Sequence, residues 1–114
     1  MIKDSYKINN KITIYPGDIL SITAPPINNK KDIMIIGILK EKECTILIPE
    51  PFKNISNPVY RTISYKNIKE ITTSWKWSYI GNVIDDTFPS FIWKLQYASM
   101  ITKFNHLYNK HLDL

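Results

Sequence analysis

Two apolar runs separated by a charged segment dominate the pattern of hydrophobic and polar positions in this chain. The runs cover residues 33–39 and 45–48, and the segment between them, 40–43, reads Lys-Glu-Lys-Glu. Short isoleucine-rich runs bounded by turn residues are typical of β-strands. The pattern therefore predicts a central β-hairpin, in which Gly37 marks a bulge or a bend of the first strand.

Shorter segments on the N-terminal side of this hairpin also carry a pattern. Residues 1–10 are polar and predict an arm or a short helix, whereas residues 11–15 (KITIY) alternate as a half-buried strand does. Pro16-Gly17-Asp18 predicts a turn, and residues 19–23 predict a second short strand or a continuation of the first after a kink. Prolines and asparagines predict a loop over residues 24–31.

On the C-terminal side of the hairpin, prolines predict a second loop over residues 49–58. The β-branched and aromatic residues of 59–65 predict another strand. A single helical turn is predicted at 66–68, and residues 69–73 (KEITT) are predicted to form the last strand of the sheet.

About five short strands with turn signals between them indicate a small sandwich or barrel. The order resembles small barrels of the SH3-like and Sm-like type, through Pro16-Gly17-Asp18 before a strand, the strand bent at Gly37, and residues 64–71 (SYKNIKEI) near the end. The resemblance covers residues 11–73 and implies a bent β-barrel. It implies no function, because such barrels serve nucleic acids, peptides and enzymes alike, and it leaves a homo-oligomer open, since Sm-like barrels often form rings.

The composition changes after Ser74. Residues 85–89 (DDTFP) are typical of a helix start, because acids lie near the positive end of the helix dipole and proline is accepted in the first turn. Residues 90–112 lack glycine and proline and carry an apolar stripe at helical spacing, which predicts a long helix packed on the barrel or on a partner. The stripe consists of Phe91, Leu95, Ala98, Ile101, Phe104 or Asn105, and Tyr108.

The predicted fold class is therefore mainly β with a C-terminal helix, in a single domain of 114 residues. The domain has four parts: an N-terminal arm (1–10), a small β-barrel of about five strands (11–73), an aromatic strand or linker (74–88) and a C-terminal helix (89–112).

The charge balance favours a polyanionic partner. Fifteen lysines and arginines against ten acids give a net charge of +5 and a pI near 9.3. Isoleucine, lysine, asparagine and tyrosine have AT-rich codons, however. An AT-rich genome, such as that of some viruses or mobile elements, would raise the lysine content without any role in anion binding. The charge is therefore discounted.

The predicted location is intracellular, either cytoplasmic or associated with a nucleoid or an organelle. Cys44 is the one cysteine and has no partner for an internal disulfide. The chain has no run of about 18 uncharged apolar residues, so we expect no membrane span, and its first residues lack the apolar core of a secretory leader.

Trp75-Lys76-Trp77-Ser78-Tyr79 is the clearest candidate for a ligand surface. In a strand both tryptophans and the tyrosine share one face. Aromatic rings interleaved with a lysine suit base stacking and phosphate contact, and they equally suit protein interfaces. The alternative role for the two tryptophans, and the favoured one, is a seam between the barrel and the C-terminal helix.

Basic residues extend this candidate surface. Arg61 is the one arginine, and a guanidinium binds phosphate with two parallel hydrogen bonds as lysine does not. The competing interpretation is that Arg61 and the neighbouring lysines are ordinary exposed residues with no role in binding. The hypothesis of first choice is a non-enzymatic module that binds RNA or DNA. Its predicted contacts are Arg61, Lys66, Lys69, Lys76, Trp77 and Tyr79.

A protein-interaction module is the second hypothesis: an adaptor, an assembly subunit or a phage-type inhibitor of a host protein. It rests on the aromatic content of the C-terminal helix, where Trp93 and Tyr97 lie four residues apart and share a face. The predicted partner contacts are Trp93, Tyr97, Phe104 and Tyr108.

Catalytic signals are nearly absent from the sequence. It contains no HExxH, paired CxxC, P-loop or glycine-rich fingerprint, and a Cys44–His106 dyad has no support from spacing. We therefore expect no enzyme activity, no cofactor and no metal.

Overall fold

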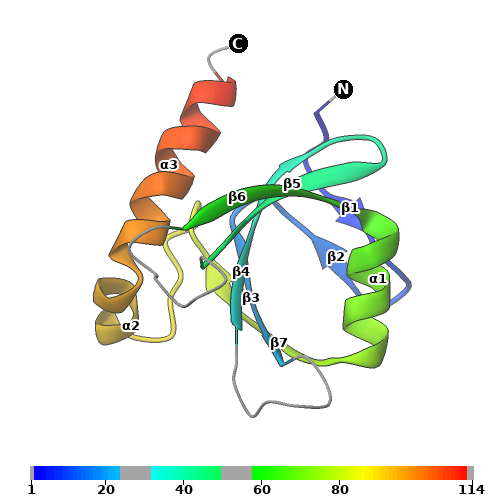
Figure 1. The fold of residues 1–114 in the computed structure, drawn as a ribbon, viewed down its shortest axis with the longest axis horizontal. Helices are drawn as coiled ribbons and strands as arrows, with labels where there is room; N and C mark the ends of the chain where they lie inside the picture. Colours follow the sequence, from blue (N-terminus) through cyan, green and yellow to red (C-terminus); the bar gives the residue numbers. More distant parts are fainter. Residues whose placement is uncertain (1, 24–31, 50–57, 113–114) are drawn as a thin grey trace.

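A computed structural model describes residues 2–23, 32–49 and 58–112, and the predicted loop over 24–31 and most of that over 49–58 lie outside these ranges. The fold is mainly β, with a five-stranded antiparallel sheet in the order β6-β5-β4-β3-β7 and helices at the C-terminus (Figure 1). The strands are β3 (Asp18–Thr23), β4 (Asp32–Leu39), β5 (Glu43–Ile48), β6 (Val59–Ser64) and β7 (Lys76–Asn82).

The predicted central hairpin is confirmed as β4 and β5, and β4 is the middle strand of the sheet. Its side chains alternate between two apolar clusters, Met34 and Ile36 on one face and Ile33 and Ile35 on the other. Both faces of β4 are therefore covered, which explains why its sequence is a continuous apolar run and not an alternating one.

Gly37 marks a bulge, as predicted. The register with β5 shifts between Ile36 and Leu39, so β4 has one extra residue there. The backbone N–H of Ile38 donates to the hydroxyl of Thr45 at 2.7 Å, and a Cβ on Gly37 would overlap that hydroxyl. The side chain of Thr45 thus supplies the partner that the interrupted ladder lacks.

A small ribbon and a helix cover the first face of the sheet. The ribbon pairs β1 (Tyr6–Lys7) with β2 (Thr13–Ile14), which is shorter than the predicted strand over 11–15. The helix, α1 (Tyr65–Ser74), joins β6 to β7. Ile14 and Ile68 are fully buried between these elements and the sheet.

The predicted strand over residues 69–73 is wrong, because these residues form the second half of α1. The Ser64 hydroxyl accepts a hydrogen bond from the Asn67 backbone N–H at 3.2 Å and caps the helix. Tyr65, Ile68 and Ile71 then face the core at a spacing of three, which a strand cannot provide. The fifth strand is β7, so the sheet extends to residue 82 and not to 73.

The C-terminal segment forms two helices, α2 (Phe91–Gln96) and α3 (Ala98–Leu112), interrupted at Tyr97. The predicted C-terminal helix over 89–112 is confirmed apart from this interruption, but residues 85–89 do not start it. The Ser90 hydroxyl caps α2 by accepting from the Trp93 N–H at 3.1 Å, and no acid lies in the first turn. Asp86 instead lies in a turn with φ of 55° and pairs with Lys94 at 2.9 Å.

The predicted apolar stripe is wrong in its first half and right further along. Phe91, Leu95 and Ala98 are exposed, whereas Ile101, Phe104 and Tyr108 pack against the second face of the sheet. Met100, which the predicted stripe did not include, is fully buried there. The side chains that pack on the sheet, Trp93, Tyr97, Ile101, Phe104 and Tyr108, keep helical spacing across the interruption at Tyr97, so the predicted stripe began on the wrong face of the first helix. No helix in the described ranges is both long and apolar enough to cross a membrane.

Candidate binding surfaces

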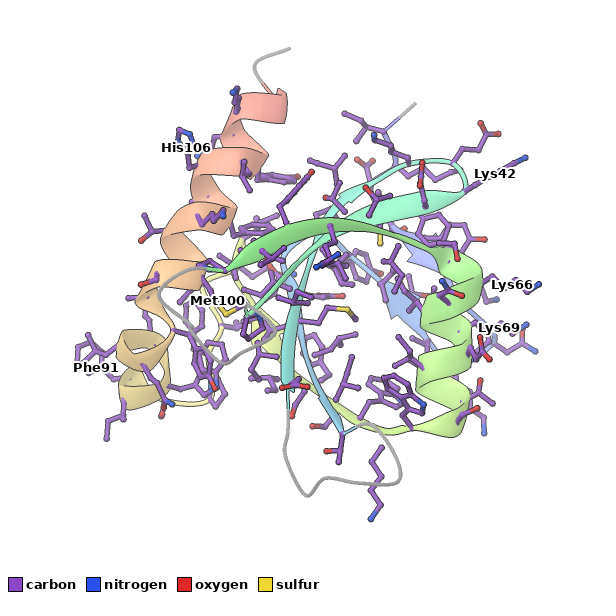
Figure 2. The ribbon with its side chains drawn as sticks, viewed as in Figure 1. Lys42, Lys66, Lys69, Phe91, Met100 and His106 are labelled. Atoms are coloured by element: carbon purple, nitrogen blue, oxygen red, sulfur yellow. The ribbon has the colours of Figure 1, made fainter. Side chains whose placement is uncertain are left out.

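The predicted nucleic-acid contacts are divided among three elements. Lys66 and Lys69 are exposed on α1 and point away from the body, on the same side of the view as Lys42 at the hairpin tip, as Figure 2 shows. The backbone of Lys42 accepts from the first N–H of α1, which holds the hairpin tip beside the helix. Arg61 and Lys76 are exposed on the two edge strands of the sheet, β6 and β7.

Trp77 is half-buried in a seam, as the competing interpretation expects, but the seam is with α1 and not with the C-terminal helix. Its indole Nε1–H donates to the Thr72 carbonyl of α1 at 3.0 Å, and its ring packs on the first apolar cluster. Trp75 ends α1 by donating its N–H to the Ile71 carbonyl, and it is 36% exposed. Trp75 therefore offers more surface for stacking than Trp77.

Tyr79 is 56% exposed and lies in the middle of β7, next to Asp18 of β3. Partial burial and the nearby Asp18 carboxylate raise the pKa of its hydroxyl, and a hydrogen bond with Thr87 opposes the shift. The surroundings of Tyr79 are therefore acidic, which is unfavourable for a phosphate.

The four predicted partner contacts of the C-terminal segment hold the helices to the sheet. Phe104 is 3% exposed and leaves no surface for a partner. Trp93, Tyr97 and Tyr108 are partly buried against the same cluster. The Trp93 and Tyr97 rings contact each other in a tilted arrangement with centroids 4.4 Å apart, and the Phe104 and Tyr108 rings stack with centroids 5.4 Å apart.

The opposite face of α2 is apolar and exposed. Phe91, Ile92 and Leu95 are 73%, 76% and 60% exposed, and Phe91 projects away from the body in Figure 2. The sequence interpretation placed Phe91 and Leu95 on the inner stripe and did not consider Ile92. The signal that finds this face is the Trp93–Tyr97 pair, because once that pair faces the core, positions 91, 92 and 95 must face solvent.

A hollow of about 460 Å³ lies where β3 begins and β7 ends. It was not predicted from the sequence, although two of its lining residues, Tyr79 and Tyr108, were selected for other roles. The side chains that give it its character are Tyr15, Asp18, Tyr79, Asn82, Asp85 and Tyr108.

Asn82 and Asp18 form the floor of this hollow, and both are buried. The Asn82 amide donates to the Asp18 carboxylate and to the Pro16 carbonyl, each at 2.9 Å, and accepts from the Asp85 N–H at 2.9 Å. The second Asp18 oxygen accepts from the Tyr15 N–H at 2.8 Å. Every polar group of the Asn82 side chain is thus used to join β3, β7 and the turn after β7.

Burial raises the pKa of the Asp18 carboxyl above its ordinary value of 3.8, although hydrogen bonds from Asn82 and Tyr15 oppose the shift. The folded protein therefore binds this proton more tightly than the unfolded chain does. The contribution of Asp18 to the free energy of unfolding must decrease as the pH rises from about 3.8 through the raised pKa, and recover as the pH falls.

Denaturant unfolding of the natural protein and of Asp18→Asn tests this linkage, since the difference between the two isolates Asp18 from the other acids. The free energy of unfolding of the natural protein, minus that of the variant, should be smaller near about pH 7 than near about pH 3. A difference that grows with pH would show that the folded state favours the ionised carboxylate.

Cys44 and His106, the pair considered as a dyad, lie on opposite sides of the sheet. Cys44 is fully buried in the first apolar cluster, and burial raises the pKa of its thiol to about 12, which suits a packing residue. His106 projects to solvent from α3 (Figure 2), which packs on the other face of the sheet. Residues 2–23, 32–49 and 58–112 contain no group of three or more His, Cys, Asp or Glu side chains placed to hold a metal ion.

Three surfaces are therefore candidates for binding: the lysines of α1 with Lys42, the apolar face of α2, and the hollow at the end of β7. Comparisons with protein-family models, with curated proteins and with solved structures found no match.

Proposed function

We propose that this chain is a non-enzymatic binding module that docks on a protein partner through the exposed face of α2. The single observation that carries this proposal is the exposure of Phe91, Ile92 and Leu95 on one side of a short helix. Exposing large apolar side chains to water is unfavourable in free energy, and a contiguous patch of them is typical of an interaction site. A few such anchors supply most of the binding free energy of an interface.

The chemistry of the partner follows from the charges around this face. Lys94 is the one charged residue of α2, and it pairs with Asp86 at 2.9 Å. The apolar face itself carries no charge. The matching surface is therefore an apolar groove without a charged floor, and binding to it should depend only weakly on salt.

A random peptide library provides a probe of defined chemistry for this face. Peptides selected on the natural protein should be rich in aliphatic and aromatic residues. The double variant Ile92→Ser with Leu95→Ser should weaken their binding at least about tenfold, because it removes two anchors. Fluorescence anisotropy at low and high salt measures the affinity, and Thr102→Ser, at an exposed position of α3, is the matched control.

The docking proposal fails if selected peptides bind the double variant and the natural protein equally well. Both substituted side chains are exposed, so the fold should survive the change. Circular dichroism of the variant checks this independently of binding.

Nucleic acid is the second candidate ligand, supported by the three lysines, Lys42, Lys66 and Lys69, that project from the same side of the molecule (Figure 2). Trp75 and Lys76 follow at the end of α1 and add an exposed ring and a further positive charge. The exposed acid Glu70 lies among them on α1 and weakens the positive field. Arg61 lies on β6, and Tyr79 lies further along β7 beside Asp18, so the smaller site consists of α1 and its flanks.

Salt dependence tests this second candidate. If about three phosphates are contacted, the affinity for a single strand should fall roughly tenfold or more between about 50 and 200 mM salt, because counterions are released on binding. The double variant Lys66→Glu with Lys69→Glu should abolish binding, whereas Lys110→Glu on α3 should not. Undetectable binding at low salt would exclude the nucleic-acid role.

We also propose that the sheet belongs to the SH3-like or Sm-like group of bent barrels. The order β6-β5-β4-β3-β7, with the helix α1 between β6 and β7 in the sequence, supports this assignment together with the bulge at Gly37. The edge strands β6 and β7 are the elements through which such a barrel would pair with a second copy of itself. Sedimentation equilibrium distinguishes a ring or dimer from a monomer.

A further inference from the structure

The hollow at the end of β7 has the size of a small-molecule site. Its volume of about 460 Å³ lies within the range of roughly 300–1,000 Å³ that such sites occupy. It does not overlap the apolar face of α2, since none of Phe91, Ile92 and Leu95 lines it. Its function is therefore separate from the docking proposed above.

Three tyrosines line this hollow from three different parts of the chain. Tyr15 precedes β3, Tyr79 lies on β7 and Tyr108 lies on α3. Tyr15 and Tyr79 are 51% and 56% exposed, so a ligand can reach their rings. Tyr108 stacks on the buried ring of Phe104 and is thereby held in place.

The charges in the hollow favour a cation. Three carboxylates line it, those of Asp4, Asp18 and Asp85, against one ammonium group, that of Lys3. Within the described residues, Lys3 makes no ion pair with any of them. The hollow thus has the opposite sign to the protein as a whole, whose net charge is +5.

We propose that this hollow binds an organic ammonium ion, with the tyrosine rings against its methyl or methylene groups and the aspartates balancing its charge. Cations are attracted to the faces of aromatic rings, and quaternary ammonium groups are the ligands that several rings recognise together. The hydrogen bonds of Asn82 fix the floor in advance, so little ordering is required on binding.

Choline and its neutral carbon isostere, 3,3-dimethyl-1-butanol, form a matched pair of probes for this site. They have the same shape, and only choline carries the charge. NMR titration of the ¹⁵N-labelled full chain should show choline binding with millimolar affinity, with shifts at the amides of Tyr15, Tyr79 and Asn82. The neutral alcohol should bind at least about threefold more weakly, the low end of a cation–π contribution.

Two pairs of variants locate the interaction. Asp85→Asn should weaken choline binding several-fold, whereas Asp86→Asn, the neighbouring aspartate outside the hollow, should leave it unchanged. Tyr79→Leu should weaken binding and Tyr79→Phe should retain it, because the ring and not the hydroxyl is required. Both positions are exposed, so these variants should fold normally.

The proposal is overturned if the alcohol and choline bind equally, if Asp86→Asn weakens binding as much as Asp85→Asn, or if choline causes no shifts. A short neutral peptide with one trimethylated lysine, titrated in parallel, identifies the source of the ammonium group. Tighter binding of the peptide supports a protein-borne ammonium, and tighter binding of choline supports a free one.

Discussion

Replacing Phe104 by alanine should lower the free energy of unfolding by about 3 to 4 kcal/mol. The same truncation of Phe91 should change it by less than about 0.5 kcal/mol. Phe104 is 3% exposed and packs against Ile35 and Leu47 of the sheet, so its removal leaves a cavity. Phe91 is 73% exposed and has little packing to lose.

This pair of variants tests how the C-terminal helices are oriented on the sheet. Urea unfolding followed by tryptophan fluorescence gives both free energies, and each variant is the control for the other. A loss above about 1 kcal/mol for Phe91→Ala, or below about 1 kcal/mol for Phe104→Ala, would place the wrong face of the helices on the core. The exposed face of α2 would then not be available to a partner.

Replacing Asn82 by alanine should lower the free energy of unfolding by about 2 to 3 kcal/mol. The side chain is 3% exposed and makes three hydrogen bonds, to Pro16, Asp18 and Asp85. Its truncation leaves the buried Asp18 carboxylate with one fewer donor and the Pro16 carbonyl without this partner. An unsatisfied buried polar group costs about 1 to 3 kcal/mol.

Asn105→Ala is the matched control for Asn82, because Asn105 is exposed on α3 and alanine is favoured in helices. It should change the free energy of unfolding by no more than about 0.5 kcal/mol. If Asn82→Ala changes the free energy of unfolding as little as Asn105→Ala does, the Asn82 side chain does not join β3 to β7, and the hollow has no fixed floor. Choline binding should be lost in Asn82→Ala together with that stability.

The hairpin of β4 and β5 could be predicted from the sequence because its signal is local. A continuous apolar run with a charged tip permits few other structures, and the bulge at Gly37 follows from one residue. Residues 69–73 (KEITT) have no such local signal, because their short sequence fits a strand as well as the helix α1 that they form. The cap at Ser64 and the spacing of Tyr65 and Ile68 carry the signal instead.

The candidate surfaces depend on tertiary packing and were harder to predict. The orientation of α2 is set by the packing of Trp93 and Tyr97 on the sheet, whereas the sequence pattern places Phe91 and Leu95 there equally well. The floor of the hollow is formed by Asp18 and Asn82, which are 64 residues apart in the sequence and joined by a hydrogen bond. No local pattern indicates that these two side chains meet.

Site-specific photo-crosslinking in cells that express the protein tests the central proposal most directly. A benzophenone amino acid is placed at position 92 on α2 and, in separate variants, at positions 66 and 69 on α1. The account predicts one discrete protein adduct from position 92 that disappears when Leu95→Ser is added, and no adduct from α1. A nuclease-sensitive adduct from positions 66 and 69, with none from position 92, would contradict it.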